Sequence, residues 1–448
     1  RGEITEDREA YRSMLAIAVP AVAEMVSIAL IGMVDVVMVG RLGAYAVTAV
    51  GLTTQPRFIF LSVFFALNVA VTAIVSRRKG EGNREAARLC LRMAIFFEIA
   101  LGTLLAAISV FVSRDIMLLA GAKADTVDAA AIYFKTMSYS LPMQILSVTI
   151  CAAQRGVGNT RVTMKVNITA NVIKLALNFL LIEGRFGFPR LEVQGAAIST
   201  VIGMTTGLIL AVASLLPSDA YLRISFRDSW KLDRAMLKTI FRLTGGSMLE
   251  QVSFRVGFFT YARIVADLGT DSFAAHMIAM QLMNLSFTFA DGFAAASTSL
   301  VGQNLGKRRP DLSIMYGKIG QRLAFCVAVV LCFASFYGRF FFASLFTSEP
   351  PIISLTAGII VILAMILPMQ TSQIVMAGSL RGAGDTRYVA LTMLITVVFI
   401  RPGVSFLMIY VFGMGLSGAW YAIAADQAVR LLMLFTRFSR GRWINLSV

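Results

Sequence analysis

Residues 141–161, LPMQILSVTICAAQRGVGNTR, return 226 positions later, at 367–387, as LPMQTSQIVMAGSLRGAGDTR. The same offset pairs Glu24 with Glu250, so the correspondence extends far beyond one motif. One register held over such a distance indicates two copies of one multi-helix unit. In an apolar chain, two such units facing each other are the usual architecture of a transporter.

The composition is that of a chain that lies in a lipid bilayer. Of its 448 residues, 57% are hydrophobic and only 15% are charged. About 20 apolar residues are needed to cross a bilayer. Twelve apolar runs of about that length or more follow one another: 10–39, 47–75, 87–112, 126–153, 162–183, 193–216, 236–265, 271–301, 312–336, 351–379, 388–411 and 415–438. The sequence therefore predicts an all-α integral membrane protein with twelve transmembrane helices and no soluble catalytic or nucleotide-binding domain.

The repeat divides the chain into two six-helix bundles. The first covers 1–216, a polar cytoplasmic linker covers 217–235, and the second covers 236–448. Because each unit has six helices, both copies have the same orientation in the membrane, which makes a parallel repeat. Beyond residue 187 the register shifts by three, so that Gly195 matches Gly418. The first bundle is expected to carry the proton, cation and drug site.

The net charge of +16 is unevenly distributed. Lys and Arg gather in the even-numbered connections, as at Arg77, Arg78 and Lys79, and at both ends of the chain, whereas the odd-numbered connections hold few. This bias predicts that both termini are cytoplasmic. It also favours contact with anionic lipids over nucleic acid. We expect a multi-pass protein of the inner (plasma) membrane, acting as a monomer.

Several motifs together resemble one family. The pattern LPMQ…RGxGxTR in both halves, VDVVMVGRLG at 34–43 and STSLVGQNLG at 297–306 are similar to the multidrug and toxic compound extrusion (MATE) transporters. The few carboxylates of the second half suggest the DinF-type branch. The sugar transporters of the major facilitator superfamily also have two six-helix halves, but their G-x-x-x-D-R-x-G-R-R loop is replaced here by SRRKGEGNRE at 76–85. The resemblance implies two six-helix bundles and drug export driven by an ion gradient.

Ionisable side chains inside a membrane are costly and therefore mark candidate functional residues. Those that recur in both copies, such as Glu24 and Glu250, are best explained by a shared scaffold. Those that break the repeat indicate a task acquired by one unit. Four polar residues break it: Asp35 opposite Tyr261, Lys174 opposite Ile400, Asn178 opposite Val404, and Asp291 opposite Phe65.

Asp35, Asn178 and Lys174 are predicted to converge. Asp35 lies about one turn before the end of helix 1, Asn178 lies at a similar level of helix 5, and Lys174 lies one turn deeper on the same face. A partly desolvated carboxylate there would exchange protons near neutral pH. We expect Asp35 to be the coupling residue, paired with Lys174 until it is protonated.

The family resemblance agrees with this assignment, because it implies a coupling Asp in helix 1. Its Asn-x-x-x-Asp pattern in helix 5 reads Lys174 and Asn178 here, and the missing carboxylate favours H⁺ over a Na⁺ cage. No other cofactor is expected. The Arg residues of the copied motif, Arg155 and Arg381, are read as headgroup anchors beside a tight turn.

The remaining site predictions concern binding and movement. Cationic, amphiphilic small molecules are expected to bind by dispersion and cation–π contact in an apolar cavity. Its predicted lining is Asp35, Met33, Met38, Gln55, Phe60, Phe64 and Asn178. Secondary candidates are Glu250, which resembles the helix-7 acid of the NorM-type branch, Asp291 as a gate or drug site, and Glu24. The predicted hinges are Pro20, Pro142 and Pro368.

The sequence thus predicts a secondary active multidrug exporter in which protonation of Asp35 competes with a cationic substrate. A Na⁺-coupled exporter is one alternative. Another is a flippase for lipid-linked saccharides, for which the basic candidates are Lys174, Arg57, Arg255 and Arg401. An intramembrane enzyme would need a nucleophile–base pair or a metal set, which one His and scattered carboxylates do not supply. A passive channel would not need a titratable Asp on one bundle only.

Overall fold

The structure, a computed structural model, describes residues 7–42, 44–120, 122, 127–224 and 232–446. Within these ranges every regular element is a helix, and there is no strand. The helices follow the predicted apolar runs closely, which confirms the all-α fold with twelve membrane-crossing rods.

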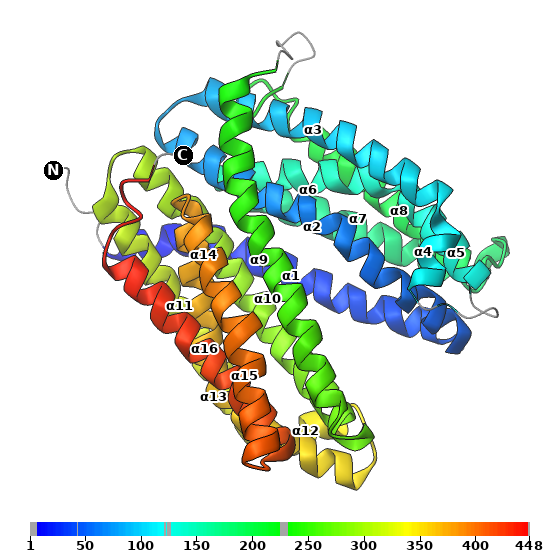
Figure 1. Ribbon diagram of the computed structural model, residues 1–448. Coiled ribbons are helices and arrows are strands. Elements are labelled where there is room, and N and C mark those ends of the chain that lie inside the picture. The colour runs from blue at the N-terminus through cyan, green and yellow to red at the C-terminus, as the bar shows by residue number, and fades with distance from the viewer. Residues whose placement is uncertain (1–6, 43, 121, 123–126, 225–231, 447–448) are drawn as a thin grey trace. The chain divides into compact units, whose positions relative to one another are not determined.

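The first six rods are formed by the first half of the chain (Figure 1). Their elements are α1 (Asp7–Gly40), α2 (Ala44–Gly80), α3 (Arg84–Phe111) with the short α4 (Ser113–Leu119), α5 (Val127–Tyr139) with α6 (Leu141–Gly156), α7 (Thr160–Leu181), the 3₁₀ turn η1 (Arg185–Gly187) and α8 (Glu192–Ala213).

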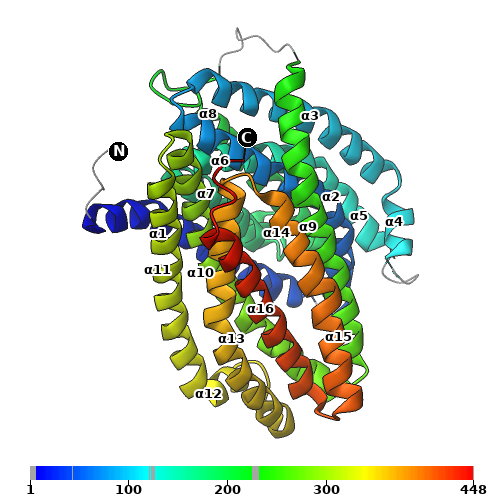
Figure 2. The ribbon, with the colours of Figure 1, turned by 60° about the vertical axis from the view of Figure 1, so that its left-hand side comes forward.

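The second half repeats this order. Its elements are α9 (Arg234–Ala266), α10 (Thr270–Gly306), α11 (Pro310–Tyr337) with α12 (Arg339–Ser344), α13 (Pro350–Gly382), the eleventh rod, and α16 (Gly415–Ser439). The eleventh rod consists of α14 (Thr386–Met393), η2 (Leu394–Ile400), α15 (Arg401–Phe406) and η3 (Leu407–Val411), of which η2 and η3 are π-helical. In Figure 2, α14 and α15 follow one another beside α16.

The fourth rod is broken rather than continuous. α5 ends at Tyr139 and α6 begins at Leu141, while the Ser140 amide bonds back to the Met137 carbonyl at 3.0 Å. Pro142 lies in the first turn of α6, where its missing N–H costs nothing. The expectation that Pro142 lies inside a helix is therefore corrected, since it follows a break. Pro20 and Pro368 do lie inside α1 and α13. The hinge role of all three stays a prediction.

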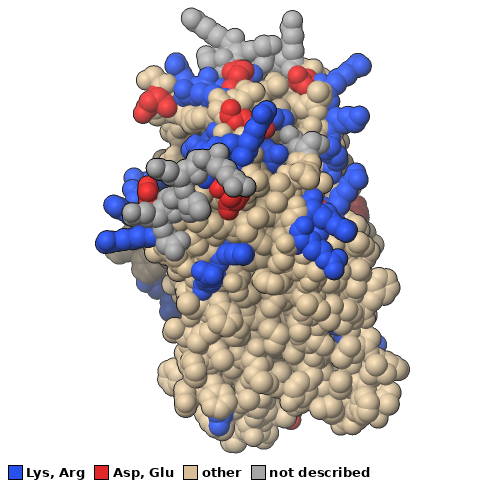
Figure 3. Space-filling model, turned by 90° about the vertical axis from the view of Figure 1, so that its left-hand side faces the viewer, with Lys and Arg blue, Asp and Glu red and all other residues tan. Residues whose placement is uncertain are grey.

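Length and apolar composition identify nine membrane-spanning helices in the described part of the chain. The fourth, seventh and twelfth rods are too short or too charged to be identified in this way. The break at Ser140 leaves pieces of 13 and 16 residues. α9 and α16 carry charged side chains in their middles, including Glu250, Asp426 and Arg430. On the face in Figure 3, Lys and Arg gather at one end, and a band below is nearly free of charge.

The packing of the chain defines two units whose boundaries fall inside α1 and α9. Ala23–Thr244 forms one, called here the N-terminal unit, and Arg1–Val22 with Gly245–Val448 forms the C-terminal unit. The start of α1 thus packs with the second repeat, where Met14 and Ala18 contact a core cluster that includes Phe293. The end of the linker and the start of α9 belong to the N-terminal unit. The packing boundaries therefore differ from the repeat boundaries, which are defined by sequence.

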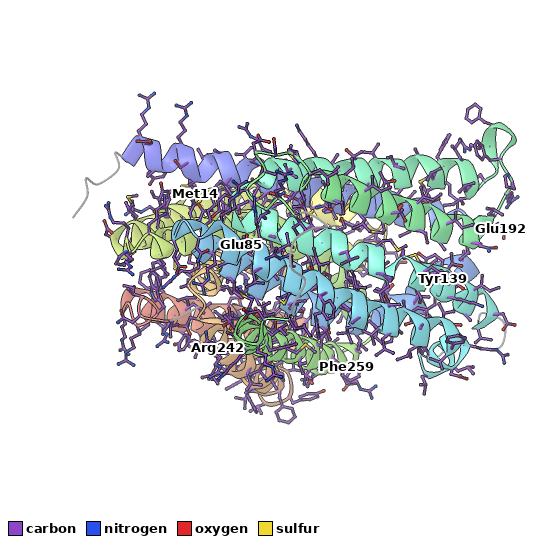
Figure 4. All side chains as sticks on the ribbon, turned by 90° about the horizontal axis from the view of Figure 1, so that it is seen from above. Met14, Glu85, Tyr139, Glu192, Arg242 and Phe259 are labelled. Atoms are coloured by element: carbon purple, nitrogen blue, oxygen red, sulfur yellow. The ribbon has the colours of Figure 1, made fainter. Side chains whose placement is uncertain are left out.

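Within the N-terminal unit the helix ends lie at two levels. Figure 4 labels Glu85, at the start of α3, at one end of these helices, and Tyr139 and Glu192 at the other. Asp35 lies near the end of α1, and Asn178 lies near the end of α7, next to the connection that leads to Glu192. The predicted site therefore lies toward one end of the bundle rather than at its centre.

Candidate functional site

The N-terminal unit contains a cavity of about 420 Å³. Its polar wall includes Asp35, Arg57, Lys174 and Asn178, and its apolar wall includes Phe58, Leu61 and Phe65. This volume lies in the range of pockets that bind drug-sized molecules. An apolar cavity with a few charged groups is suited to an amphiphile.

Asp35 is held in this cavity by two donors from α7. The Lys174 ammonium forms an ion pair with its Oδ2, and the Asn178 amide donates to its Oδ1 at 2.5 Å. The Asp35 and Lys174 side chains are 18% and 17% exposed, so the pair is partly desolvated but open to the cavity. The predicted convergence of the three residues is confirmed, and their roles in transport are taken up below.

A second polar contact in the cavity comes from α2 and α6. The Arg57 guanidinium donates to the side-chain oxygen of Gln144 at 2.7 Å, and Tyr133 of α5 lines the same space. Of the four basic candidates named from the sequence, Lys174 and Arg57 lie here together, whereas Arg255 and Arg401 belong to the C-terminal unit. The sequence alone did not indicate that Arg57 and Asp35 line the same cavity.

Four predicted lining residues do not face this cavity. Phe64 is 1% exposed in a core cluster, and Phe60 packs on Phe134 with ring centroids 6.4 Å apart. Met33 is 47% exposed, and Met38 packs on a separate core cluster. The side chain of Gln55 lies outside the described residues. The substrate contacts of all five stay predictions.

Helical periodicity explains which phenylalanines of α2 reach the cavity. Phe58, Leu61 and Phe65 follow one another at spacings of three and four residues and therefore share a face with Arg57. Phe60 and Phe64 do not line the cavity and pack instead in core clusters against the neighbouring helices. Two of the phenylalanines crowded in this stretch, Phe58 and Phe65, line the cavity.

The equivalent region of the C-terminal unit is filled with apolar side chains. Eight lining residues of the cavity correspond, through the repeat, to members of one buried cluster: Tyr261, Val265, Ala279, Met280, Met283, Ile359, Ala419 and Ile423. Tyr261 replaces Asp35, and its hydroxyl donates to the Ala419 carbonyl at 2.9 Å. The cavity is therefore a property of one copy and not of the shared scaffold.

The recurring glutamates each pair with the first Arg of the copied motif. Arg155 donates to Glu24 at 3.3 Å, and Arg381 forms an ion pair with Glu250. Glu24 also accepts hydrogen bonds from Thr163 at 2.6 Å. Both glutamates are nearly fully buried. The assignment of Arg155 and Arg381 as headgroup anchors is therefore corrected, because each bonds a buried carboxylate of its own unit.

The C-terminal unit has a smaller cavity of about 240 Å³, lined by Glu250, Asp291, Arg381 and Arg430 among others. This brings two secondary candidates, Glu250 and Asp291, to one place, while Glu24 lies in the other unit. Arg430 continues into a buried network, in which Arg401 and Arg430 both pair with Asp426. Whether Glu250 and Asp291 act in transport stays a prediction.

Comparison with known proteins agrees with this geometry. The MatE family matches residues 20–180 and again 247–407, which independently marks both copies of the repeat. A probable multidrug resistance protein NorM of Thermotoga maritima is 28% identical, with 98% of this chain and 94% of the relative covered.

Solved structures share the fold. A transporter of the MOP superfamily from Pyrococcus furiosus, described as having a reversed polarity of its binding pocket, superimposes with a TM-score of 0.90 at 20% identity and full coverage of both chains. An outward-facing multidrug resistance MATE family transporter gives 0.89 at 20% identity, covering 98% of this chain and 99% of that one.

These matches extend over most of the chain and over both repeats. The protein is accordingly a multi-pass membrane transporter and not an enzyme. The chain belongs to the MatE family.

Proposed function

We propose that the protein is a secondary active multidrug exporter that exchanges H⁺ for amphiphilic organic compounds carrying a positive charge. The observation that carries this proposal is Asp35, a carboxylate in the wall of a drug-sized cavity, at a position that is apolar core in the other copy. The names of relatives such as the Thermotoga maritima protein support the multidrug class.

The contacts of Asp35 support a proton rather than Na⁺ as the coupling ion. Both carboxylate oxygens accept from nitrogen donors, Lys174 and Asn178, instead of joining other oxygens around a common point. A Na⁺ or Ca²⁺ cage needs several oxygen ligands. A proton needs only one lone pair of the carboxylate, which the Lys174 ammonium now shares.

Protonation of Asp35 would turn the electrostatic attraction between the site and a cation into repulsion. With Asp35 ionised, a passenger ammonium can take the place of Lys174 at the carboxylate. With Asp35 protonated, that attraction is lost, and Lys174 remains as a cation in a partly desolvated space. The passenger is then released toward the side from which the proton came. Alternating access between the two bundles completes the exchange.

The remaining parts of the proposal concern the setting of the protein. We place it in the inner (plasma) membrane with both termini cytoplasmic, as a monomer in contact with anionic lipids. The support is the bias of Lys and Arg toward the even-numbered connections and the termini. Membership of the DinF-type branch stays a prediction from the sequence resemblance.

Dye uptake into everted vesicles tests the coupling. Ethidium accumulation is measured under an imposed pH gradient or an imposed Na⁺ gradient for the wild type, Asp35→Asn and Asp128→Asn. The last is a matched control, because Asp128 is an acid of the same unit whose side chain is 74% exposed. We expect pH-driven accumulation in the wild type and the control and none in Asp35→Asn. Accumulation that persists in Asp35→Asn under the pH gradient would remove Asp35 from the mechanism.

A further inference from the structure

Arg57 is a cation of the cavity whose described contact is neutral. Its guanidinium donates to the Gln144 amide oxygen at 2.7 Å, and none of the ion pairs found among the described residues includes it. A buried or partly buried charge is normally paired, because its desolvation is costly. Arg57 is therefore available to an anionic group that no described side chain supplies.

The charges of the cavity make this more specific. Asp35 contributes one negative charge, and Lys174 and Arg57 contribute two positive charges. A purely cationic passenger that takes Asp35 from Lys174 would leave two cationic side chains beside its own charge. A passenger that also carries a carboxylate would give these cations a partner, so it enters with less repulsion.

The helices separate the two polar groups of the cavity. Asp35 and its donors come from α1 and α7, whereas Arg57 and Gln144 come from α2 and α6. Phe58 and Phe65 add apolar surface to the same space. An elongated aromatic molecule with an amine at one place and an acid at another matches this set of groups. The planar fork of Arg is the preferred protein donor for a carboxylate.

We propose that this cavity selects zwitterionic amphiphiles, with the passenger ammonium on Asp35 and the passenger carboxylate on Arg57, which Gln144 positions. The inference rests on the proposed function, since it assigns both charges of the passenger to the same cavity. Proton exchange remains with Asp35. Arg57 does not titrate in the physiological range, so the carboxylate subsite is the same at every working pH.

The other copy of the repeat supports the pairing of Arg57 with Gln144. Gln144 corresponds to Gln370, and Arg57 corresponds to Met283. Gln370 is fully buried, and neither polar atom of its side chain has a hydrogen-bond partner in the part of the chain that the structure describes. The glutamine is thus common to both copies, but only in the N-terminal unit does it accept a hydrogen bond from an Arg.

Matched dyes test the proposal on the purified protein. Tetramethylrhodamine has a xanthylium cation and a free carboxylate, and its methyl ester has the cation alone, so the two differ by one negative charge. Fluorescein supplies a mainly anionic probe. Binding to protein in lipid nanodiscs is followed by fluorescence polarisation for the wild type, Arg57→Gln, Arg57→Lys and Arg41→Gln. Arg41 is an exposed Arg of the same unit and serves as the charge-matched control.

We expect the wild type and Arg41→Gln to bind the zwitterion about 10-fold more tightly than the ester, as befits one charge-assisted hydrogen-bonded contact. Arg57→Gln should abolish this preference while leaving ester binding within about twofold, and Arg57→Lys should keep part of it. The ratio of the two affinities should stay constant between pH 6 and pH 8, although both affinities fall with acidification.

Two results would overturn the inference. One is an equal affinity of the wild type for zwitterion and ester, and the other is tighter binding of fluorescein than of either rhodamine. Neither result touches proton coupling, which is read from ethidium accumulation in Asp35→Asn. Conversely, the wild type could prefer the zwitterion while Asp35→Asn transports ethidium normally. That result would support the carboxylate subsite and contradict proton coupling at Asp35. The two failures are therefore distinguishable.

Discussion

The two copies of the repeat use equivalent positions in opposite ways. Toward the end of α1 the N-terminal unit has a charged cavity around Asp35, whereas the C-terminal unit has a packed cluster around Tyr261 and Ile359. At the recurring Glu–Arg pair it is the N-terminal unit that is closely packed and the C-terminal unit that has a cavity. Glu24 is fully satisfied by Arg155, Thr163 and other donors, whereas Glu250 borders a cavity.

The contrast extends to the last two rods of each unit. α7 and α8 pack closely, because Gly203 lies directly against the backbone of Ala170 and the side chain of Lys174. At the positions equivalent to Gly203 and Gly207, α16 carries Asp426, which pairs with Arg401 across the interface, and Arg430, which pairs with Asp426 one turn away on the same helix. One scaffold thus tolerates either a close glycine contact or a buried ion network between the same two helices.

The largest effect is expected from breaking that network. Asp426→Ala leaves two guanidinium groups buried without their carboxylate, because Arg401 and Arg430 are 2% and 3% exposed. Such a loss costs about 3–5 kcal/mol of unfolding free energy. Thermal unfolding in detergent measures it. The triple change Asp426→Leu, Arg401→Met and Arg430→Leu should restore most of the loss, and a triple variant as unstable as Asp426→Ala would contradict the charge-based explanation.

Adding a methyl group at the close glycine contact between α7 and α8 should have the next largest effect. In Gly203→Ala the new Cβ would lie 2.9 Å from the Lys174 Cβ and 3.0 Å from the Ala170 carbonyl oxygen, so α7 and α8 must separate. We expect a loss of about 1–3 kcal/mol and a displaced Lys174.

Gly207→Ala is the matched control for the glycine contact. Its Cβ would meet neighbours only at 3.3 and 3.4 Å, so it should be milder. Unfolding and the pH profile of ethidium transport are measured for both variants. Equal effects of the two substitutions, or an unchanged pH profile in Gly203→Ala, would show that this contact does not position Lys174.

A smaller difference is expected between the two recurring glutamates. Glu24 accepts from Arg155, from Thr163 at 2.6 Å and from Asn167 at 2.7 Å, whereas Arg381 is the donor to Glu250 in the described structure. Glu24→Gln should therefore destabilise the protein by about 1 kcal/mol more than Glu250→Gln. Paired denaturation curves in one detergent provide the comparison. A larger loss in Glu250→Gln would reverse the proposed division between scaffold and cavity.

The smallest effect is expected at the exposed connection after α7. The guanidinium of Arg185, with Arg41 nearby, holds the pKa of Glu183 below its usual range. A lowered pKa stabilises the folded state above the ordinary Glu pKa, and this contribution is lost as the pH falls through the folded value. Glu183→Gln should lower the Tm slightly at pH 7 and by progressively less as the pH falls below the ordinary Glu pKa. The equivalent residue, Ile409, is buried core, so Ile409→Val should show no such pH dependence.

Much of this architecture could be predicted because it depends on local patterns. Apolar length located the twelve rods, and the repeat showed that Asp35, Lys174 and Asn178 were unusual. Counting turns from the helix ends then brought these three residues to one level. Helix geometry thus predicted the depth of these residues in the bundle, and the hydrogen bonds of Asp35 with Lys174 and Asn178 show that the two helices meet there.

Contacts between distant helices could not be predicted in the same way. Arg57 lies inside an apolar run, and Arg155 lies just beyond the end of another, where a headgroup anchor is the simplest explanation. Only packing shows that they face Gln144 and Glu24. The partners of Asp426 lie 25 residues back and one turn ahead. The break before Pro142 also depends on packing, because proline in a helix can equally produce a kink.

Proton release on passenger binding tests the central claim most directly. Purified wild-type protein and Asp35→Asn are mixed with ethidium in weakly buffered solution between pH 5 and pH 8, and a pH indicator records protons released per dye bound. Competition for one carboxylate predicts release of up to about one proton per dye in the wild type and none in Asp35→Asn, by linkage. Equal release from both proteins, or proton uptake by the wild type, would contradict the exchange at Asp35.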